Sequence, residues 1–213
     1  MELILAEKPS AARNFAKALG GKTGNYAGTE YKITNLRGHV MGLLPPDKQV
    51  PTEKVEFYKS WDLENLPWNL NDFAWKKGIL SGCKDIISGL KDELKEADCV
   101  VIATDVDPSG EGELLAWEAL EKCGWRGPTK RMYFADEAPA SVQKAFRERK
   151  TLPSMDKDGD YVKAVIRERW DLASMQFTRA ATLVARKKGF RTVVRQGRLK
   201  SVMVKLTGDQ LKA

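Results

Sequence analysis

The apolar positions in the first 120 residues form short continuous runs, each followed by residues at helical spacing. Residues 2–6 (ELILA) predict a short apolar strand, and residues 99–103 (CVVIA) have the β-branched content of a strand buried on both faces. Apolar side chains then recur at helical spacing over residues 11–19 and 114–120. Each apolar run therefore predicts a strand that leads directly into a helix.

Further strands and helices are predicted between and after these two pairs. Residues 26–36 alternate well enough for a hairpin or a pair of sheet strands, and residues 79–94 return to helical spacing. Residues 130–135 (KRMYFA) predict a third strand, which is followed by a helix at 139–149. This alternation of strands and helices is typical of a parallel layer. The sequence therefore predicts an α/β fold with a mostly parallel sheet flanked by helices.

One stretch of the first 150 residues does not fit the alternation. Residues 44–78 carry four prolines and three tryptophans. A flexible linker this rich in tryptophan is not expected, because linkers are usually polar or rich in glycine and serine. We therefore expect an ordered excursion that is packed by its aromatic side chains.

The last quarter of the chain is predicted to be helical. Residues 151–159 (TLPSMDKDG) give the best domain boundary, and residues 160–188 predict one long helix or two helices with a kink. We therefore expect a first domain at 1–152 and a helical segment at 153–213. The chain stops inside a predicted helix at 199–211, so we expect it to be part of a longer protein with further C-terminal domains.

The charge of the chain is unevenly distributed. The formal net charge is +7, but residues 1–162 carry −3 and residues 163–213 carry +10. A basic segment is what a polyanion-binding face looks like, because each phosphate that a cation neutralises releases counterions and adds affinity. The alternatives are a solvated helical face or an acidic protein partner. The charge favours nucleic acid.

The cysteine and histidine content excludes several classes of site. The chain has three widely spaced cysteines, no CxxC pair and a single histidine, His39, which argues against a zinc site. It has no signal peptide, and no apolar run is long enough to cross a membrane. We therefore expect a reducing, cytoplasmic setting, no membrane partner, and oxygen ligands for any metal ion.

A cluster of carboxylates follows the central strand, in the sequence VVIATDVDPSGEGE at residues 100–113. Asp105, Asp107 and Glu111 stand where a strand hands over to a helix, and ligands of open α/β sheets usually bind outside the carboxyl ends of the strands. Three close carboxylates repel one another unless a cation neutralises them, and all-oxygen ligands suit Mg²⁺ or Mn²⁺. The alternative is a solvated acidic turn that caps the helix.

Glu7 and Lys8 occupy the equivalent position after the first strand. If strands 2–6 and 99–103 are neighbours in one parallel sheet, these two residues share a crevice with the three carboxylates. An acid, a cation and a metal cluster would together serve phosphoryl transfer, which needs charge stabilisation and a proton for the leaving oxygen. The alternative is a surface Glu-Lys pair that caps a helix.

Several blocks of the sequence resemble the N-terminal part of type IA DNA topoisomerases, most closely the topoisomerase III branch. In chain order, the blocks are LILAEKPSAARNFAKALG, GHVMGLLPPD, KSWDLENLPW, ATDVDPSGEGELLAWEAL and RQGRLKSVMVKL. The fourth block is similar to the acidic motif of the TOPRIM domain. The resemblance covers essentially the whole chain. It implies a Rossmann-like TOPRIM domain, followed by an all-helical basic segment that begins a larger DNA-binding domain.

The resemblance also implies roles for the residues at the predicted crevice. Glu7 would be the general acid that protonates the leaving 3′ oxygen, and it would lie next to the metal ion. Lys8 would stabilise the phosphoryl transition state. The ligands of Mg²⁺ would be Asp105, Asp107 and Glu111.

In the basic segment, the resemblance implies contacts with DNA. Arg198, and with weaker correspondence Arg169 and Lys200, would hold the DNA backbone of a single-stranded or underwound substrate. The single histidine, His39, would lie near the crevice. The full enzyme would break one DNA strand by tyrosine attack on phosphorus, pass a strand and reseal the break, with Mg²⁺ and without ATP.

The sequence departs from the family pattern in two respects. The usual motif places the third carboxylate two residues after the second aspartate with an arginine between them, whereas here Pro108, Ser109 and Gly110 intervene. Either Glu111 or Glu113 could therefore be the third ligand, and spacing favours Glu111. In addition, none of the five tyrosines stands in the context of the family's nucleophile. This chain alone is therefore expected to lack the attacking residue and to relax no supercoils.

Two other functions fit part of the pattern. A stand-alone TOPRIM protein would be a metal-dependent nuclease or a DNA-binding accessory protein, with water in place of tyrosine. A phosphatase of the DxD type would use Asp105 as its own nucleophile, but this function does not explain the basic C-terminal segment.

Overall fold

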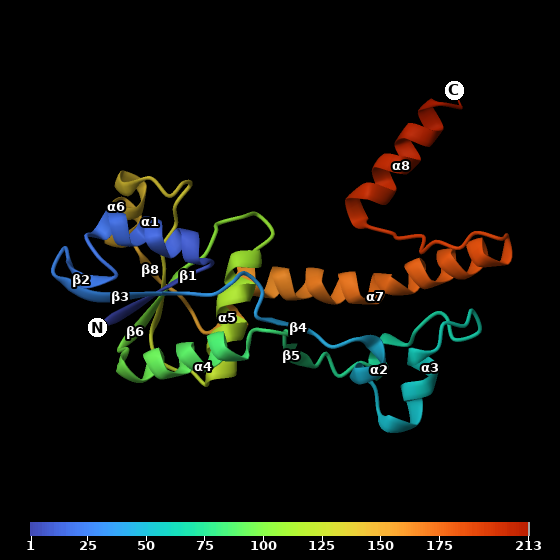
Figure 1. The fold of residues 1–213 in the computed structure, drawn as a ribbon, viewed down its shortest axis with the longest axis horizontal. Helices are drawn as coiled ribbons and strands as arrows, with labels where there is room; N and C mark the ends of the chain where they lie inside the picture. Colours follow the sequence, from blue (N-terminus) through green and yellow to red (C-terminus); the bar gives the residue numbers. More distant parts are fainter. Residues whose placement is uncertain (213) are drawn as a thin grey trace. The chain divides into compact units, whose positions relative to one another are not determined.

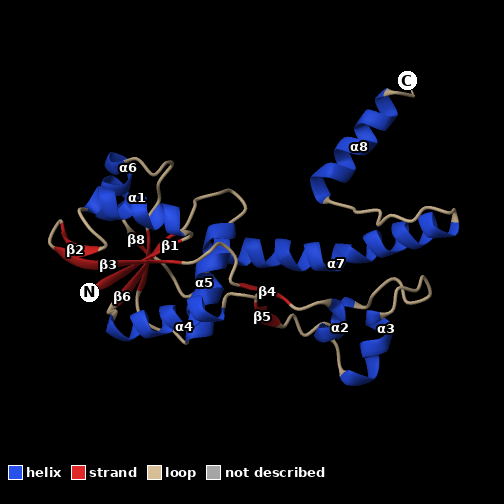
Figure 2. Cartoon of the chain, in the orientation of Figure 1, coloured by secondary structure: helices blue, strands red, loops and turns tan. Residues whose placement is uncertain are grey.

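The computed structural model describes residues 1–212, except that the side chain of Arg198 is left out of the description. Figure 1 shows the order of the helices and strands along the chain, and Figure 2 shows their distribution. The chain divides into two compact units. Unit 1 consists of Met1–Gly42 and Lys77–Arg167, and unit 2 consists of Leu43–Lys76 and Glu168–Ala213.

Unit 1 contains a six-stranded sheet with the strand order β2-β3-β1-β6-β7-β8. The strands are β1 (Glu2–Ala6), β2 (Thr23–Tyr26), β3 (Thr29–Asn35), β6 (Cys99–Ala103), β7 (Thr129–Arg131) and β8 (Lys150–Thr151). β1 pairs in parallel with β3 and β6, and β6 pairs in parallel with β7. Only the outer strands β2 and β8 pair antiparallel with their neighbours. The predicted mostly parallel sheet is confirmed.

Helices cover both faces of this sheet. α1 (Pro9–Leu19) and α6 (Pro139–Arg147) lie on one face, and α4 (Lys84–Glu93) and α5 (Glu111–Cys123) lie on the other (Figure 1). Because successive strand residues point to opposite faces, β1 contributes to two separate cores. Leu3 and Leu5 pack with α4 and α5, whereas Ile4 and Ala6 pack with α1 and α6.

Shorter elements complete unit 1. They are β4 (Met41–Leu43), β5 (Lys77–Ile79), η3 (Leu94–Glu96) and η4 (Met155–Lys157), and β4 and β5 form a separate two-stranded sheet. β4 ends one residue inside unit 2. None of the helices in the described part of the chain is long and apolar enough to span a lipid bilayer.

Unit 2 is packed by the aromatic side chains of the predicted excursion. Its short helices are α2 (Pro46–Gln49), η1 (Thr52–Lys54), α3 (Val55–Lys59) and η2 (Leu70–Asp72). Tyr58, Trp68 and Phe73 form its core together with Leu172. The buried side chain of Gln49 joins the two ends of the excursion, because its amide donates to the carbonyls of Leu44 (2.7 Å) and Lys76 (2.9 Å).

The last two helices are α7 (Gly159–Lys187) and α8 (Arg198–Gln210). α7 is one continuous helix, which settles the choice between one helix and two. It begins in unit 1, and its residues from Glu168 onward belong to unit 2. The C-terminal part of the chain is therefore helical, as predicted.

Two predicted boundaries were wrong. The strand expected at 130–135 is only β7, which ends at Arg131, because the chain then turns toward α6 and the Asp136 carboxylate accepts the backbone N–H of Ala138 (2.9 Å). The helix expected from Ile79 begins at Lys84, because Lys77–Ile79 are a strand and Gly82 turns the chain with a φ of +76°.

Candidate active site at the carboxyl edge of the sheet

The parallel register of β1 and β6 brings two sequence-distant segments together. Ala6 is the partner of Ala103, so the residues that follow both strands leave the sheet at the same edge. The carboxylate of Glu7 accepts the backbone N–H of Asp105 (3.1 Å). The ammonium of Lys8 lies 3.2 Å from the carboxylate of Asp105, and both side chains are about half exposed. The hydrogen bond and the charge interaction with Asp105 raise the pKa of Lys8 above its usual value.

The loop between β6 and α5 is tightly packed and depends on two glycines. At Gly110, where φ is +75°, a Cβ would lie 2.2 Å from the backbone oxygen of Asp160. At Gly112, a Cβ would lie 2.1 Å from the backbone oxygen of Asp105. The hydroxyl of Thr104 also donates to the carbonyl of Gly112 (2.8 Å). The end of the loop therefore packs against Asp105 at its beginning and against Asp160 at the start of α7. This packing restricts where the carboxylates of the loop can lie.

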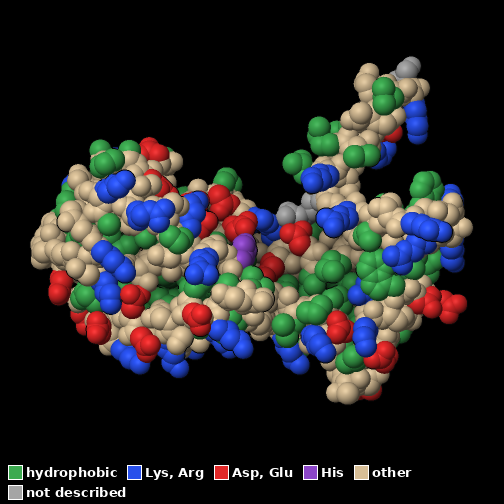
Figure 3. Space-filling view, viewed as in Figure 1, with side chains coloured by type: hydrophobic (Ala, Val, Ile, Leu, Met, Phe, Trp, Pro, Cys, Tyr) green, Lys and Arg blue, Asp and Glu red, His purple; other side chains and the backbone are tan. Residues whose placement is uncertain are grey.

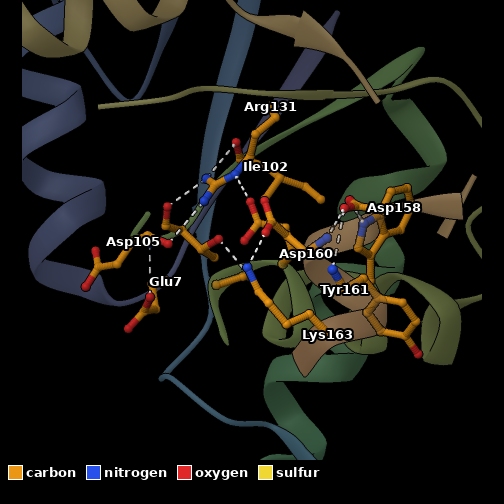
Figure 4. Close-up of polar contacts among 12 residues, drawn as sticks. Glu7, Ile102, Asp105, Arg131, Asp158, Asp160, Tyr161 and Lys163 are labelled. Carbon is orange, nitrogen blue, oxygen red and sulfur yellow. Dashed lines mark hydrogen bonds and ion pairs between the residues drawn. The ribbon is translucent and has the colours of Figure 1, made fainter. Parts of the chain in front are cut away.

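Arg131, at the end of β7, holds the beginning of this loop from inside the protein. Its guanidinium is fully buried and donates to the carbonyls of Thr104 (2.7 Å) and Asp105 (3.1 Å) (Figure 4). The same guanidinium pairs with the buried carboxylate of Glu113 (2.6 Å). The carboxylate of Glu113 is therefore occupied by this buried ion pair. Glu111, the other alternative for the third carboxylate, has no contact with Arg131 among those that the structure gives for it.

The carboxylate of Glu111 points to different partners. It lies 2.7 Å from a ring nitrogen of His39 and 2.7 Å from the guanidinium of Arg167 on α7. The hydrogen bond with His39, followed by that with Arg167, outweighs partial burial and lowers the pKa of Glu111 below its usual value. The side chain of Glu111 is 37% exposed, so solvent and ions reach it.

Asp107 is held mainly by its own loop. Its carboxylate accepts the backbone N–H of Ser109 (2.7 Å) and also the Ser109 hydroxyl. Burial by itself raises the pKa of Asp107, but these hydrogen bonds and one from the backbone of Gly112 outweigh it, so that the pKa lies below the usual value. Asp107 is therefore an anion at neutral pH.

The donor set at this edge has the chemistry of a site for a hard divalent cation. Asp105, Asp107 and Glu111 supply only oxygen atoms, and all three are partly exposed, which suits Mg²⁺. The carboxylates are not gathered around one point: within residues 1–212, no three His, Cys, Asp or Glu side chains lie close enough together to hold a metal ion. Each carboxylate has its own partners instead: Asp105 pairs with Lys8, Asp107 accepts hydrogen bonds from Ser109, and Glu111 contacts His39 and Arg167.

The predicted DNA-binding residues all belong to unit 2. The guanidinium of Arg169 lies over the ring of Trp75, 5.1 Å from its centroid. Lys200 is exposed on α8. Arg198 is the first residue of α8, and its side chain is not among those that the structure describes. The structure therefore places these three residues on two helices of unit 2, α7 and α8.

Sequence reasoning missed two residues at this edge. Arg131 was included only as part of a strand, although a charged residue inside a short apolar strand signals a buried partner. Arg167 lies in the helix expected over residues 160–188, and nothing in the local sequence marks it as a site residue. Its contact with Glu111 spans 56 residues, and no local pattern reports it.

Comparisons with known proteins agree with this architecture. The family model described as Toprim domain matches residues 2–136. The chain is 30% identical to DNA topoisomerase 3 of Staphylococcus epidermidis over 70% of this chain and 20% of that protein. It is also 30% identical to DNA topoisomerase 3 of Bacillus subtilis, over 84% of this chain and 24% of that protein.

Among solved structures, full-length topoisomerase I from Thermotoga maritima matches with a TM-score of 0.48 and 22% identity, over 70% of this chain and 21% of that one. The chain spans no more than about a quarter of the length of the two curated relatives. The match to the Toprim family model covers more than half of the chain. The chain belongs to the Toprim family.

Proposed function

We propose that this chain supplies the acid-bearing and metal-binding half of a site that cleaves and rejoins DNA strands in a Mg²⁺-dependent reaction. One observation carries the proposal: the parallel pairing of β1 with β6 sets Glu7 and Lys8 against Asp105. A carboxyl group, an ammonium group and a loop with three further carboxylates then share one accessible edge. Phosphoryl transfer needs these groups, because negative charge must be stabilised on the phosphoryl oxygens and a proton must reach the leaving oxygen.

In this proposal, Glu7 and Lys8 act directly on the scissile phosphate. Lys8 stabilises negative charge on the phosphoryl oxygens, and its ammonium is 44% exposed, so it can reach a bound DNA strand. Glu7 protonates the 3′ oxygen that leaves during cleavage and takes the proton back during resealing. Its hydrogen bond with the backbone of Asp105 orients the carboxylate.

The ligands of Mg²⁺ would be Asp105, Asp107 and Glu111. When bound, the ion would supply Lewis-acid stabilisation of the phosphate charge. The chain's own cations neutralise Asp105 and Glu111 in the present structure, since Lys8 pairs with the former and Arg167 with the latter. Lys8 and Arg167 would release the carboxylates and become available to the DNA phosphates.

The nucleophile in this proposal is a tyrosine outside this chain. Burial raises the pKa of Tyr58 to about 12, and it also raises the pKa values of Tyr31 and Tyr133. Raised pKa values disfavour the phenolate, which is the attacking form. Tyr31 is also held in the core, where its hydroxyl donates to the carbonyl of Leu19 (2.9 Å).

The basic residues of unit 2 would hold the DNA backbone. Arg169, Arg198 and Lys200 belong to a segment, 163–213, with a net charge of +10. Contacts of this kind give affinity that is independent of sequence and falls with salt. The expected substrate is single-stranded or underwound DNA.

The proposal is tested by incubating the purified chain and its Asp105→Asn variant with negatively supercoiled plasmid and Mg²⁺. We expect DNA binding that weakens with salt, no relaxation and no nicking. Relaxation by the wild-type chain would overturn the assignment of the nucleophile to another segment. Mg²⁺-dependent nicking that Asp105→Asn abolishes would instead establish the nuclease alternative, in which water is the attacking group.

A further inference from the structure

Unit 2 exposes a tryptophan that is flanked by two arginines. Trp61 follows α3, and 41% of its side chain is accessible. The guanidinium carbon of Arg179 lies 5.4 Å from the centroid of its ring, and that of Arg186 lies 5.7 Å from it. Both arginines belong to α7, seven residues apart, which places them on the same side of the helix.

The inner arginine fixes this arrangement. Arg179 is only 7% exposed and donates to the carbonyls of Tyr58 (2.6 Å) and Ser60 (3.1 Å). Its guanidinium also lies 4.7 Å from the ring centroid of Trp68. Two buried nitrogen atoms of this pair, the Nε of Arg179 and the indole nitrogen of Trp68, have no hydrogen-bond partner among the described residues. The arginine is therefore held by aromatic faces and two carbonyls.

Exposed cations continue from this point along the chain. Arg186, Lys187, Lys188, Arg191 and Arg195 are all exposed, and they form a basic strip, residues 186–195. The strip returns along α7, because the backbone N–H of Val194 donates to Thr182 Oγ1 (3.0 Å) and that of Gln196 to Thr178 Oγ1 (3.2 Å). Figure 3 shows Lys and Arg side chains gathered around the end of α7.

We propose that Trp61, together with the guanidinium of Arg186, forms a stacking platform for an unpaired nucleobase, and that the basic strip tracks the adjoining phosphates of a single strand. Exposed aromatic rings beside cations bind single-stranded nucleic acid in this way, since every base has a π face and every linkage carries a charge. Folded duplex offers no free base face. This inference rests on the DNA binding of the proposed function, and it names the side chains of unit 2 that would contact an unpaired base.

The test compares two fluorescein-labelled strands of twelve residues, oligo-dT and the same backbone with abasic residues, by fluorescence anisotropy. We expect Trp61→Ala to weaken binding of oligo-dT about tenfold and to leave binding of the abasic strand within about twofold. An equal loss on both strands, or no loss on either, would overturn the stacking role. Trp61→Phe keeps an aromatic face and should restore most of the affinity, which separates stacking from a packing defect.

Two control variants sharpen the result. Phe57 is equally exposed, at 42%, and lies on the same excursion, so Phe57→Ala should leave the affinity for both strands unchanged. Arg186→Ala should reduce the slope of log affinity against log salt by about 0.7, whereas Trp61→Phe should not change that slope. Equal effects of Phe57→Ala and Trp61→Ala would contradict a specific platform.

The outcomes also distinguish this inference from the proposed function. If the wild-type chain binds neither strand, DNA binding by unit 2 and the platform fail together. If it binds both strands equally and Trp61→Ala changes nothing, the proposed DNA binding stands and the platform alone fails. Polyglutamate could also be added as a competitor for the labelled strand. If it binds more tightly than oligo-dT, and if Trp61→Ala weakens its binding as well, the ligand of this surface would be an acidic protein and the proposal of a single strand would be overturned.

Discussion

The two units each bury an arginine and satisfy it in opposite ways. In unit 1, Arg131 is fully buried and is neutralised by the carboxylate of Glu113, with its remaining donors on backbone carbonyls. In unit 2, Arg179 is 7% exposed and lies against the rings of Trp61 and Trp68. Within the described residues, no ion pair with a carboxylate is recorded for Arg179.

This difference matches what each unit presents to solvent. The Arg131–Glu113 pair fixes the beginning of an acidic loop, so the charges outside it remain available for a metal ion and for Lys8. The guanidinium of Arg179 lies instead against an exposed tryptophan, Trp61. The contrast agrees with the two proposals, in which unit 1 binds a cation at its acidic edge and unit 2 binds a single nucleic-acid strand.

The largest expected effect comes from breaking the ion pair of unit 1. Arg131→Met leaves the carboxylate of Glu113 buried without a partner, and we expect a loss of about 3–5 kcal/mol in the free energy of unfolding, measured by urea denaturation. Arg126→Met, at an exposed arginine, is the matched control and should change stability by less than about 0.5 kcal/mol. Adding Glu113→Leu to Arg131→Met should recover part of the loss. A loss below about 1 kcal/mol in the single variant would contradict the role of Arg131.

The corresponding change in unit 2 should cost less. Arg179→Met removes two hydrogen bonds to carbonyls but leaves no buried anion, so we expect a loss of about 2–3 kcal/mol. Hydrogen exchange of peptides from residues 43–76 reports this unit separately from the sheet. Faster exchange confined to the sheet of unit 1 would contradict the assignment of Arg179 to unit 2.

In unit 2, Tyr58 should make the stability sensitive to alkaline pH. Burial, with a contribution from the hydrogen bond to Asp72, raises the pKa of Tyr58 to about 12. The neutral phenol is therefore favoured by folding: this stabilisation is complete below the unfolded pKa of about 10 and is lost as the pH rises through 12. The stability that wild type loses between pH 10 and 12 should exceed that of Tyr58→Phe by about 2 kcal/mol. Equal losses would show that Tyr58 is not the group responsible.

The smallest expected effect is an acid-dependent one in unit 1. Burial alone raises the pKa of Glu2, but hydrogen bonds from Arg149 and Lys130 outweigh it and lower the pKa below 4.5. This stabilisation is present above the unfolded pKa and is lost as the pH falls through the lowered value. Glu2→Gln should therefore cost about 1 kcal/mol at pH 7 and progressively less below pH 4. A cost that stays constant from pH 7 to pH 3 would contradict the ion pairs.

The central pairing of the sheet could be predicted from the sequence because its signals are local. The runs at 2–6 and 99–103 are apolar on both faces, as parallel buried strands are, and both are strands in the structure. The sequence did not show whether these two strands are neighbours in the sheet. In the structure they pair in parallel, with Ala6 opposite Ala103.

The sequence indicated that Lys8 and His39 lie near the acidic loop, but it could not give the individual contacts of the loop. Glu111 contacts His39 and Arg167, which lie 72 and 56 residues away, and only the folded sheet brings them together. The strand expected at 130–135 stopped early because a turn closed by Asp136 follows it, and periodicity does not report such a turn. The ion pair between Glu113 on α5 and Arg131 on β7 likewise depends on the folded structure, because it joins a helix to a strand.

The most direct test of the central claim measures divalent-cation binding to the acidic loop. Titration with Mn²⁺, followed by the loss of its free electron paramagnetic resonance signal, should show binding that Mg²⁺ competes for. The double variant Asp105→Asn/Asp107→Asn should bind at least tenfold more weakly, while Asp92→Asn, at an exposed aspartate of α4, should match the wild type. Equal Mn²⁺ affinity in the wild type and the double variant would contradict the account.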